Sequence, residues 1–249
     1  MNLSQFTSQK STKSIADLPE TIAVAIDKLP TRLVQLAYAS FDSWVEASWD
    51  DFVAIAGNEE PEGLPSVKAY YYNQRMHMVP LGYEHSRQNN IPYKVATLFA
   101  AFNKVKSIEC INATLRKTGH KECQPDLSIY LGEIKTLPAS GSNQIIDLNQ
   151  CDPPTLAIEV AVSSLADDLG PKKALYQELG IQEYWVINAL KRSLIAYDLS
   201  GEAAQEITQS VVLPGLDLAI VTEALRRTEE NDDAAITLWL VNLFGPKNS

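Results

Sequence analysis

The feature that most constrains the fold of this chain is a very apolar segment with one carboxylate at its centre. The run 155–162 reads Thr-Leu-Ala-Ile-Glu-Val-Ala-Val, which is typical of a buried strand. Side chains alternate between the two faces of a strand, so the large aliphatic residues share one face and Glu159 lies on the other, between Ala157 and Ala161. Burial of an unpaired carboxylate is unfavourable, so a cation or a proton must compensate Glu159.

A second carboxylate stands at the start of another predicted strand, residues 125–131. The same alternation places Asp126 on the face opposite to Leu127 and Ile129. Two ways of compensating Glu159 therefore stay open, a divalent metal shared with Asp126 or a lysine from the next helix. Carboxylate oxygens with water in the remaining positions suit Mg²⁺ or Mn²⁺.

The helix predicted over residues 170–179 brings lysines close to the Glu159 strand. Because Pro171 lacks an amide hydrogen, it fits the first turn of a helix, so Asp168 is predicted to be the N-cap rather than a residue of the helix face. Lys172 then lies in the first or second turn, near the end of the strand. Lys173 points about 100° away from Lys172 and is the weaker candidate.

The remaining pattern mixes strands and helices, which predicts an α/β (α+β) fold. Helices are expected at 48–57, from Pro92 onward, at 217–227 and at 233–244, and strands at 69–79, 108–116, 145–146, 182–188 and 193–199. The predicted organisation is an N-terminal arm (1–45), one main domain (46–228) and a C-terminal helix or tail (229–249).

Composition restricts the class of partner. The chain has 31 acidic and 21 basic residues and a net charge of −10, which argues against a broad, sequence-independent grip on nucleic acid. If the protein binds nucleic acid, a local basic patch must make the contact. The most basic cluster consists of Arg116, Lys117, His120 and Lys121. It either follows a phosphate backbone or is only a solvated patch at the end of a strand. The three cysteines lack zinc-site spacing, and the apolar runs are too short for a membrane span, so we expect a cytoplasmic protein.

Short motifs between residues 125 and 216 form a combination that is more specific than any one of them, within a similarity that covers roughly residues 48–225. They are Pro125-Asp126, Ile158-Glu159-Val160, the run 168–172, Tyr176, the run 180–185 (Gly-Ile-Gln-Glu-Tyr-Trp) and the run 213–216 (Leu-Pro-Gly-Leu). Together they resemble the PD-(D/E)XK nuclease superfamily and, more narrowly, the Uma-type family of putative restriction endonucleases.

The resemblance implies a restriction-endonuclease-like mixed β-sheet flanked by helices and a metal-dependent endonuclease that hydrolyses phosphodiester bonds, with DNA as the expected substrate. It implies Mg²⁺ or Mn²⁺ held by Asp126, Glu159 and the backbone carbonyl of Val160. It also implies a lysine that orients or activates the attacking water. The superfamily usually places this lysine two residues after the glutamate, where this chain has Ala161, and the Uma-type pattern suggests Lys172 instead.

Other interpretations stay open beside this one. Ala161 and the acidic net charge favour a non-catalytic module that binds nucleic acid or protein, in which Asp126 caps a turn and Glu159 forms a buried ion pair with Lys172. The aromatic residues of the motifs, Tyr176, Tyr184 and Trp185, are expected in the core or at an interface. His85 stands where Uma-type sequences commonly have a histidine. Nucleases of this type often pair to cut both strands, and the acidic C-terminal helices offer a surface for a homodimer.

Overall fold

The computed structural model describes residues 18, 20–56, 67–80, 83–133, 136–138, 145–162 and 164–246, with side chains of the helix that starts at residue 83 described from residue 88. The chain divides into two compact units, residues 1–80 and 81–249. The predicted boundaries after residues 45 and 228 fall inside these units, and the arm and tail assignments stay predictions. No described helix is long and apolar enough to cross a membrane.

The first unit packs three helices with a small antiparallel sheet of strand order β1-β3-β2. Its elements are α1 (Glu20–Asp27), α2 (Thr31–Asp42), β1 (Val45–Glu46), α3 (Trp49–Ala56), β2 (Val67–Tyr72) and β3 (Arg75–Pro80). The predicted start of α3 is confirmed, since the Ser48 hydroxyl accepts a hydrogen bond from the Asp51 amide at 3.1 Å.

The single strand predicted over 69–79 is wrong, because the chain reverses within it. β2 and β3 pair antiparallel as a hairpin, and the two turn residues Asn73 and Gln74 have φ of 50° and 55°. Positive φ at both central positions is the geometry of a type I′ turn, whose twist matches that of the flanking strands. The alternating pattern runs through the turn, so periodicity alone did not reveal it.

The second unit is built on a six-stranded mixed sheet of order β12-β11-β10-β9-β7-β4. The strands are β4 (Ser107–Ile111), β7 (Leu127–Leu131), β9 (Leu156–Ala161), β10 (Glu183–Asn188), β11 (Ser193–Asp198) and β12 (Gln205–Ile207). β9 and β10 run parallel, and the other neighbours are antiparallel. Three short strands lie beside one another in this unit as well, β6 (Lys121–Cys123), β5 (Leu115–Lys117) and β8 (Ile146–Asp147).

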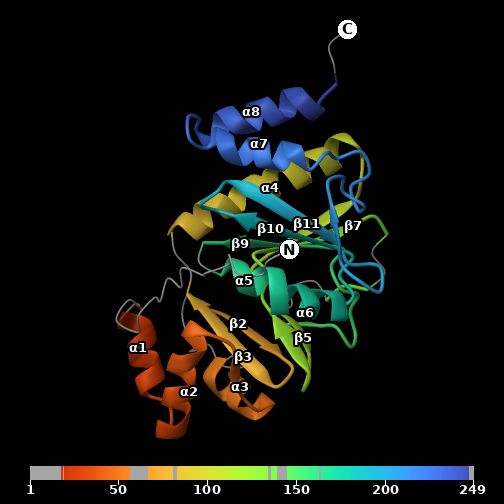
Figure 1. Ribbon diagram of the computed structural model, residues 1–249. Helices are drawn as coiled ribbons and strands as arrows, with labels where there is room; N and C mark the ends of the chain where they lie inside the picture. The colour runs from red at the N-terminus through yellow and green to blue at the C-terminus, as the bar shows by residue number, and fades with distance from the viewer. Residues whose placement is uncertain are drawn as a thin grey trace, which may run out of the picture. The chain divides into compact units, whose positions relative to one another are not determined.

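Helices cover both faces of the six-stranded sheet (Figure 1). On one side are α4 (Tyr83–Phe102), α7 (Ala219–Arg227) and α8 (Asp233–Phe244). On the other side are α5 (Leu165–Asp167), the π-helical turn η2 (Asp168–Lys172) and α6 (Lys173–Glu178). The predicted α/β fold, a mixed sheet flanked by helices, is therefore confirmed.

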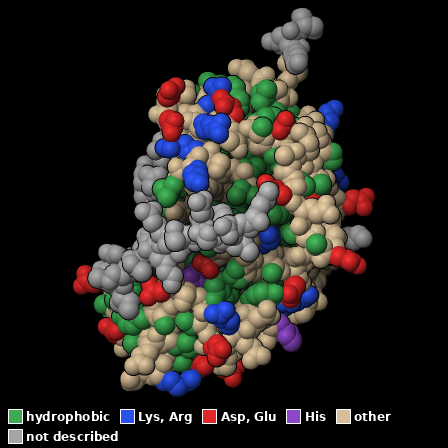
Figure 2. Space-filling model, viewed as in Figure 1, with side chains coloured by type: hydrophobic (Ala, Val, Ile, Leu, Met, Phe, Trp, Pro, Cys, Tyr) green, Lys and Arg blue, Asp and Glu red, His purple; other side chains and the backbone are tan. Residues whose placement is uncertain are grey.

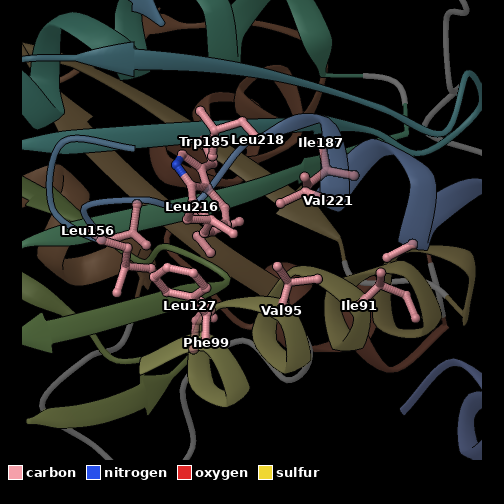
Figure 3. Packing of buried hydrophobic residues seen from close by; sticks show 14 of the residues in the cluster. Ile91, Val95, Phe99, Leu127, Leu156, Trp185, Ile187, Leu216, Leu218 and Val221 are labelled. Carbon is pink, nitrogen blue, oxygen red and sulfur yellow. The ribbon is translucent and has the colours of Figure 1, made fainter. Parts of the chain in front are cut away.

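The hydrophobic core of this unit lies between the sheet and α4. It contains the aliphatic side chains that were predicted to share one face of β7 and of β9. Figure 3 shows α4 side chains such as Val95 and Phe99 directed at Leu127 of β7 and Leu156 of β9. Each fully buried side chain of this size contributes roughly 1.5–3 kcal/mol. Since these residues face α4, the side chains between them face α5, η2 and α6.

Helix α4 begins earlier than predicted, at Tyr83, so Pro92 lies inside it rather than at its start. A proline in a helix interior removes one hydrogen bond but keeps helical φ. The apolar side chains Ile91, Val95 and Phe99, on both sides of the proline, belong to the hydrophobic core of this unit.

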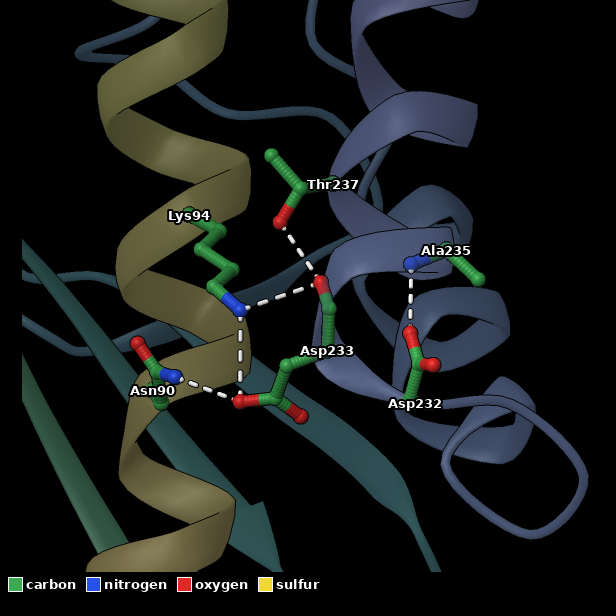
Figure 4. Close-up of polar contacts among 6 residues, drawn as sticks. All are labelled: Asn90, Lys94, Asp232, Asp233, Ala235 and Thr237. Atoms are coloured by element: carbon green, nitrogen blue, oxygen red, sulfur yellow. Dashed lines mark hydrogen bonds and ion pairs between the residues drawn. The ribbon is translucent and has the colours of Figure 1, made fainter.

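Polar contacts fix α8 against α4 (Figure 4). The Asp232 carboxylate accepts a hydrogen bond from the Ala235 amide at 2.8 Å and caps the helix. The next carboxylate, Asp233, accepts a hydrogen bond from Asn90 Nδ2 at 2.8 Å and lies 3.3 Å from Lys94 Nζ.

Candidate functional site

Two neighbouring strands bring the predicted carboxylates together. Leu127 pairs with Ile158 in the antiparallel ladder between β7 and β9, so the next position places Asp126 beside Glu159. The Asp126 Oδ2 atom accepts a hydrogen bond from the Val160 amide at 2.8 Å. Asp126 is 0% and Glu159 2% exposed, so both carboxylates lie inside the protein.

The helix beside the strands differs from the prediction in a way that changes the role of Asp168. Helical structure starts at Leu165 and passes through η2 into α6, and Pro171 is accommodated in the wider π-helical turn. The N-cap assignment of Asp168 is wrong, because Asp168 has helical φ and ψ of −66° and −39° and is buried. Its Oδ2 accepts a hydrogen bond from the Ser164 hydroxyl at 2.7 Å.

Lys172 extends from this helix to the predicted carboxylate. Its Nζ atom lies 2.7 Å from Asp168 Oδ1 and 3.7 Å from Glu159 Oε1, with the side chain 2% exposed. Burial alone would lower the pKa of Lys172, but Asp168, Glu159 and Asp126 outweigh it and raise the pKa above its ordinary value. The amine is therefore a buried cation rather than a solvated surface lysine.

The neighbouring lysine and the usual lysine position both lie outside this cluster. Lys173 Nζ lies 4.1 Å from the centre of the Tyr197 ring, on β11. Ala161, two residues after Glu159, is buried in β9 and pairs with Asn188 of β10. Of the two adjacent lysines of this helix, Lys172 is thus the one that the fold brings to Glu159.

Tyr176, which the sequence indicated only as an aromatic residue of the core or an interface, also takes part in the site. Its hydroxyl donates a hydrogen bond to Glu159 Oε1 at 2.5 Å, and its ring packs on that of Tyr184 with centres 4.8 Å apart. The spacing of Asp168, Lys172 and Tyr176, each four residues after the last, was the available signal. Trp185 lies in the hydrophobic core, as predicted.

Glu183, which the sequence indicated only as part of the run 180–185, is a further buried carboxylate. It accepts hydrogen bonds from Trp185 Nε1 at 2.6 Å, from the Ser210 hydroxyl at 3.0 Å and from the amides of Val211 and Val212 at 2.7 and 3.0 Å. Burial raises the pKa of Glu183, and these donors oppose the rise. Its contacts tie β10 to the loop that carries the Leu-Pro-Gly-Leu motif, so its role is structural.

The basic cluster before Asp126 is partly neutralised by acids. Arg116 and Glu122, both buried, form an ion pair between β5 and β6, and Lys121 Nζ lies 2.7 Å from Glu178. Burial raises the pKa of Glu122 to about 7, against the effect of Arg116.

The α7–α8 end of the second unit also carries mixed charge. Blue and red side chains lie next to each other there in Figure 2. Three of its cations have acidic partners, in the pairs Lys94–Asp233, Arg192–Glu229 and Arg227–Glu223.

The described residues offer few protein ligands for a metal ion at this site. Within the described residues, no three His, Cys, Asp or Glu side chains are grouped to hold a metal. Mg²⁺ usually binds through one or two carboxylates and keeps several waters, a requirement that Asp126, Glu159 and the Val160 carbonyl can meet. The side chain of His85 lies outside the described part of α4.

Comparison with known proteins identifies the family of this chain. Residues 49–235 match the Uma2 family, described as putative restriction endonuclease. The crystal structure of a putative nuclease belonging to DUF820 from Anabaena variabilis ATCC 29413 is similar, with a TM-score of 0.45 and 15% identity over 72% of this chain and 98% of that chain. No curated protein matches the chain. The family match covers most of the sequence, and the chain belongs to the Uma2 family of putative restriction endonucleases.

Proposed function

We propose that this protein is a Mg²⁺- or Mn²⁺-dependent endonuclease that hydrolyses phosphodiester bonds in DNA. The observation that carries the proposal is the position of Asp126 beside Glu159, which follows from the strand register and is fixed by the 2.8 Å hydrogen bond from the Val160 amide to Asp126 Oδ2. Lys172 Nζ lies 3.7 Å from Glu159 Oε1. Two carboxylates and one lysine are the charged groups that this superfamily uses. They meet here although the position usually held by the lysine is Ala161.

Each residue has a definite chemical task in this proposal. Asp126, Glu159 and the Val160 carbonyl would hold the cation, which supplies Lewis-acid polarisation of a phosphoryl oxygen and a more acidic bound water. The Lys172 ammonium stabilises negative charge that develops on the phosphate, in a buried site where such an interaction is strong. Tyr176 holds the Glu159 carboxylate through its hydroxyl.

A cleavage panel tests the proposal directly. Single-stranded, double-stranded and structured DNA are incubated with the full chain in Mg²⁺, Mn²⁺ or a chelator, and metal binding is measured by calorimetry. Glu159→Gln is expected to abolish metal binding and reduce cleavage at least about 100-fold. The matched control Glu206→Gln, at an exposed position of β12, should behave like the wild type. Absence of both metal binding and cleavage in the wild type would refute the proposal.

One observation favours a second candidate, a binding module without catalysis. The amine of Lys172 is held by Asp168 and Glu159 within a buried cluster, which is also the arrangement of a structural ion-pair network. Such a module would bind nucleic acid or protein equally well in chelator. If Glu159→Gln still folds, it would bind nucleic acid or protein as the wild type does. No substrate of the panel would be cleaved.

A further inference from the structure

Three buried hydroxyls on the site face of the sheet have no hydrogen-bond partner among the described residues. They are Ser128 Oγ, Tyr130 Oη and Tyr184 Oη. Ser128 and Tyr184 are 0% exposed, so bulk water does not reach them. Most buried polar groups are hydrogen-bonded, and alanine or phenylalanine would fill the same positions without an unsatisfied group. These hydroxyls are therefore available to a bound water molecule or ligand, where one lies within reach.

Two of the hydroxyls lie in one row across the sheet. Ser128 pairs with Ala157, and Ala157 pairs with Tyr184, so the small alanine side chain stands between them. The next row on the same face contains Asp126 and Glu159, each two residues away along its strand. Side chains two residues apart on a strand share a face. The hydroxyl row therefore borders the carboxylate row.

Tyr184 is close to the charged part of the site. Its ring packs 4.8 Å from that of Tyr176, which donates its hydroxyl hydrogen to Glu159. Burial, followed by the negative charges of Asp168, Glu159 and Asp126, raises the pKa of Tyr184 well above its ordinary value, so the hydroxyl stays protonated. A neutral phenol beside carboxylates is suited to hydrogen-bonding water and not to binding a metal directly.

We propose that Tyr184 and Ser128 accept hydrogen bonds from water molecules carried by a divalent cation held at Asp126 and Glu159, and are positioning residues of that site. The inference rests on the proposed function and extends it from the metal ligands to the metal's water shell. Mg²⁺ keeps several waters when it binds to proteins. Groups that orient the atoms around a metal typically change its affinity by about 10- to 100-fold.

Calorimetry on the full chain provides the test, with Mg²⁺ as one probe and cobalt(III) hexammine as the other. The second ion keeps its ammine shell and can bind only through hydrogen bonds and charge. Tyr184→Phe and Ser128→Ala are each expected to weaken Mg²⁺ binding about tenfold. Tyr184→Phe should also weaken binding of the hexammine ion. In the wild type this ion should compete with Mg²⁺ for the site.

Tyr130→Phe is the matched control, because it also removes a buried hydroxyl that has no described partner. Tyr130 lies on β7 beyond Ser128, near Cys110, Cys151 and Asp152. The Tyr130→Phe variant should bind Mg²⁺ with the same affinity as the wild type. Thermal unfolding in chelator separates a site role from a structural one, since removal of an unsatisfied hydroxyl should leave the melting temperature unchanged or raise it in all three variants.

The outcomes separate this inference from the proposed function. If Tyr184→Phe and Ser128→Ala both bind Mg²⁺ as the wild type does, while Glu159→Gln does not bind it, the inference is overturned. The metal site of the proposed function is then still supported. A lower melting temperature in Tyr184→Phe, with equal loss of affinity in Tyr130→Phe, assigns the hydroxyls to folding and also overturns it. A wild type that binds neither ion overturns both the inference and the proposed function.

Discussion

Lys172 Nζ lies 3.7 Å from Glu159 Oε1, although Lys172 belongs to a helix turn and not to the strand that carries Glu159. Two features of the helix make this contact possible. Helical structure begins at Leu165, and the π-helical turn accommodates Pro171. Asp168, one turn earlier, then holds the amine at 2.7 Å and directs it at the sheet.

Lys172→Ala should abolish cleavage, whereas Lys173→Ala should leave it unchanged, because Lys173 packs on Tyr197 outside the site. We expect a loss of at least about 100-fold, since a buried charge next to the reacting phosphate is removed. The variant also leaves two buried carboxylates without their cation, which destabilises it by about 3–5 kcal/mol. Rates must therefore be measured well below its melting temperature.

A lysine restored to the usual superfamily position offers a stricter test of the same role. Ala161 lies on the same face of β9 as Glu159, two residues further along. In the Lys172→Ala background, Ala161→Lys should recover part of the activity, provided that the double variant folds by circular dichroism. Wild-type activity in both Lys172→Ala and Lys173→Ala would show that neither lysine takes part.

Tyr176→Phe should reduce cleavage about tenfold and lower stability by roughly 1.5–3 kcal/mol, because it removes a hydrogen bond to the buried Glu159 carboxylate. The measurements are single-turnover cleavage and chemical unfolding. Tyr197→Phe, which removes a hydroxyl from β11, is the control and should retain the wild-type rate. Unchanged cleavage in Tyr176→Phe would show that Glu159 is oriented without it.

Glu183→Ala should destabilise the protein by roughly 3 kcal/mol or more, because one side-chain N–H, one hydroxyl and two backbone amides lose their acceptor. The exposed Glu206→Ala on β12 should change stability by less than about 0.5 kcal/mol. Urea unfolding of both variants provides the comparison. A small effect of Glu183→Ala would mean that the loop at 210–212 satisfies its amides in another way.

Glu122 should make stability depend on pH, because burial raises its pKa from 4.5 to about 7 in the folded protein. Between these values the unfolded chain releases the proton while the folded protein keeps it. The stability from this group is therefore complete below pH 4.5 and is lost as pH rises to about 7. The slope for one proton is at most about 1.4 kcal/mol per pH unit. Glu122→Gln should remove this component of the slope in urea unfolding between these pH values, and an unchanged slope would contradict the assignment.

Gln74→Gly should stabilise the protein by about 0.5–1 kcal/mol, because a left-handed conformation is strained for a residue with a side chain. The change also creates Asn-Gly, the preferred pair for a type I′ turn. Gln74→Ala keeps the Cβ atom and should bring no gain. Thermal unfolding of both variants distinguishes relief of strain from loss of the glutamine side chain.

The repeating patterns of the sequence were sufficient to predict five of the six strands in the six-stranded sheet of the second unit and the face on which each carboxylate lies. The single strand predicted over 108–116 was wrong, because the chain leaves the sheet after β4 and residues 115–117 form the separate strand β5. The strands around Asp126 and Glu159 were found because a buried strand with one aliphatic face has a strict period of two. The hairpin at Asn73 and the proline inside α4 were missed, since both interrupt an element without interrupting its periodic pattern.

The sequence by itself determined that Asp126 and Glu159 would each lie opposite the aliphatic face of its own strand and that a helix with lysines would follow. Only the tertiary structure decided that Lys172 meets Glu159, that Asp168 holds the lysine, and that Tyr176 joins them. Local periodicity sets the direction of a side chain relative to its own element. The distance between groups on different elements depends on strand register, on where a helix begins and on how it packs, which are properties of the whole fold.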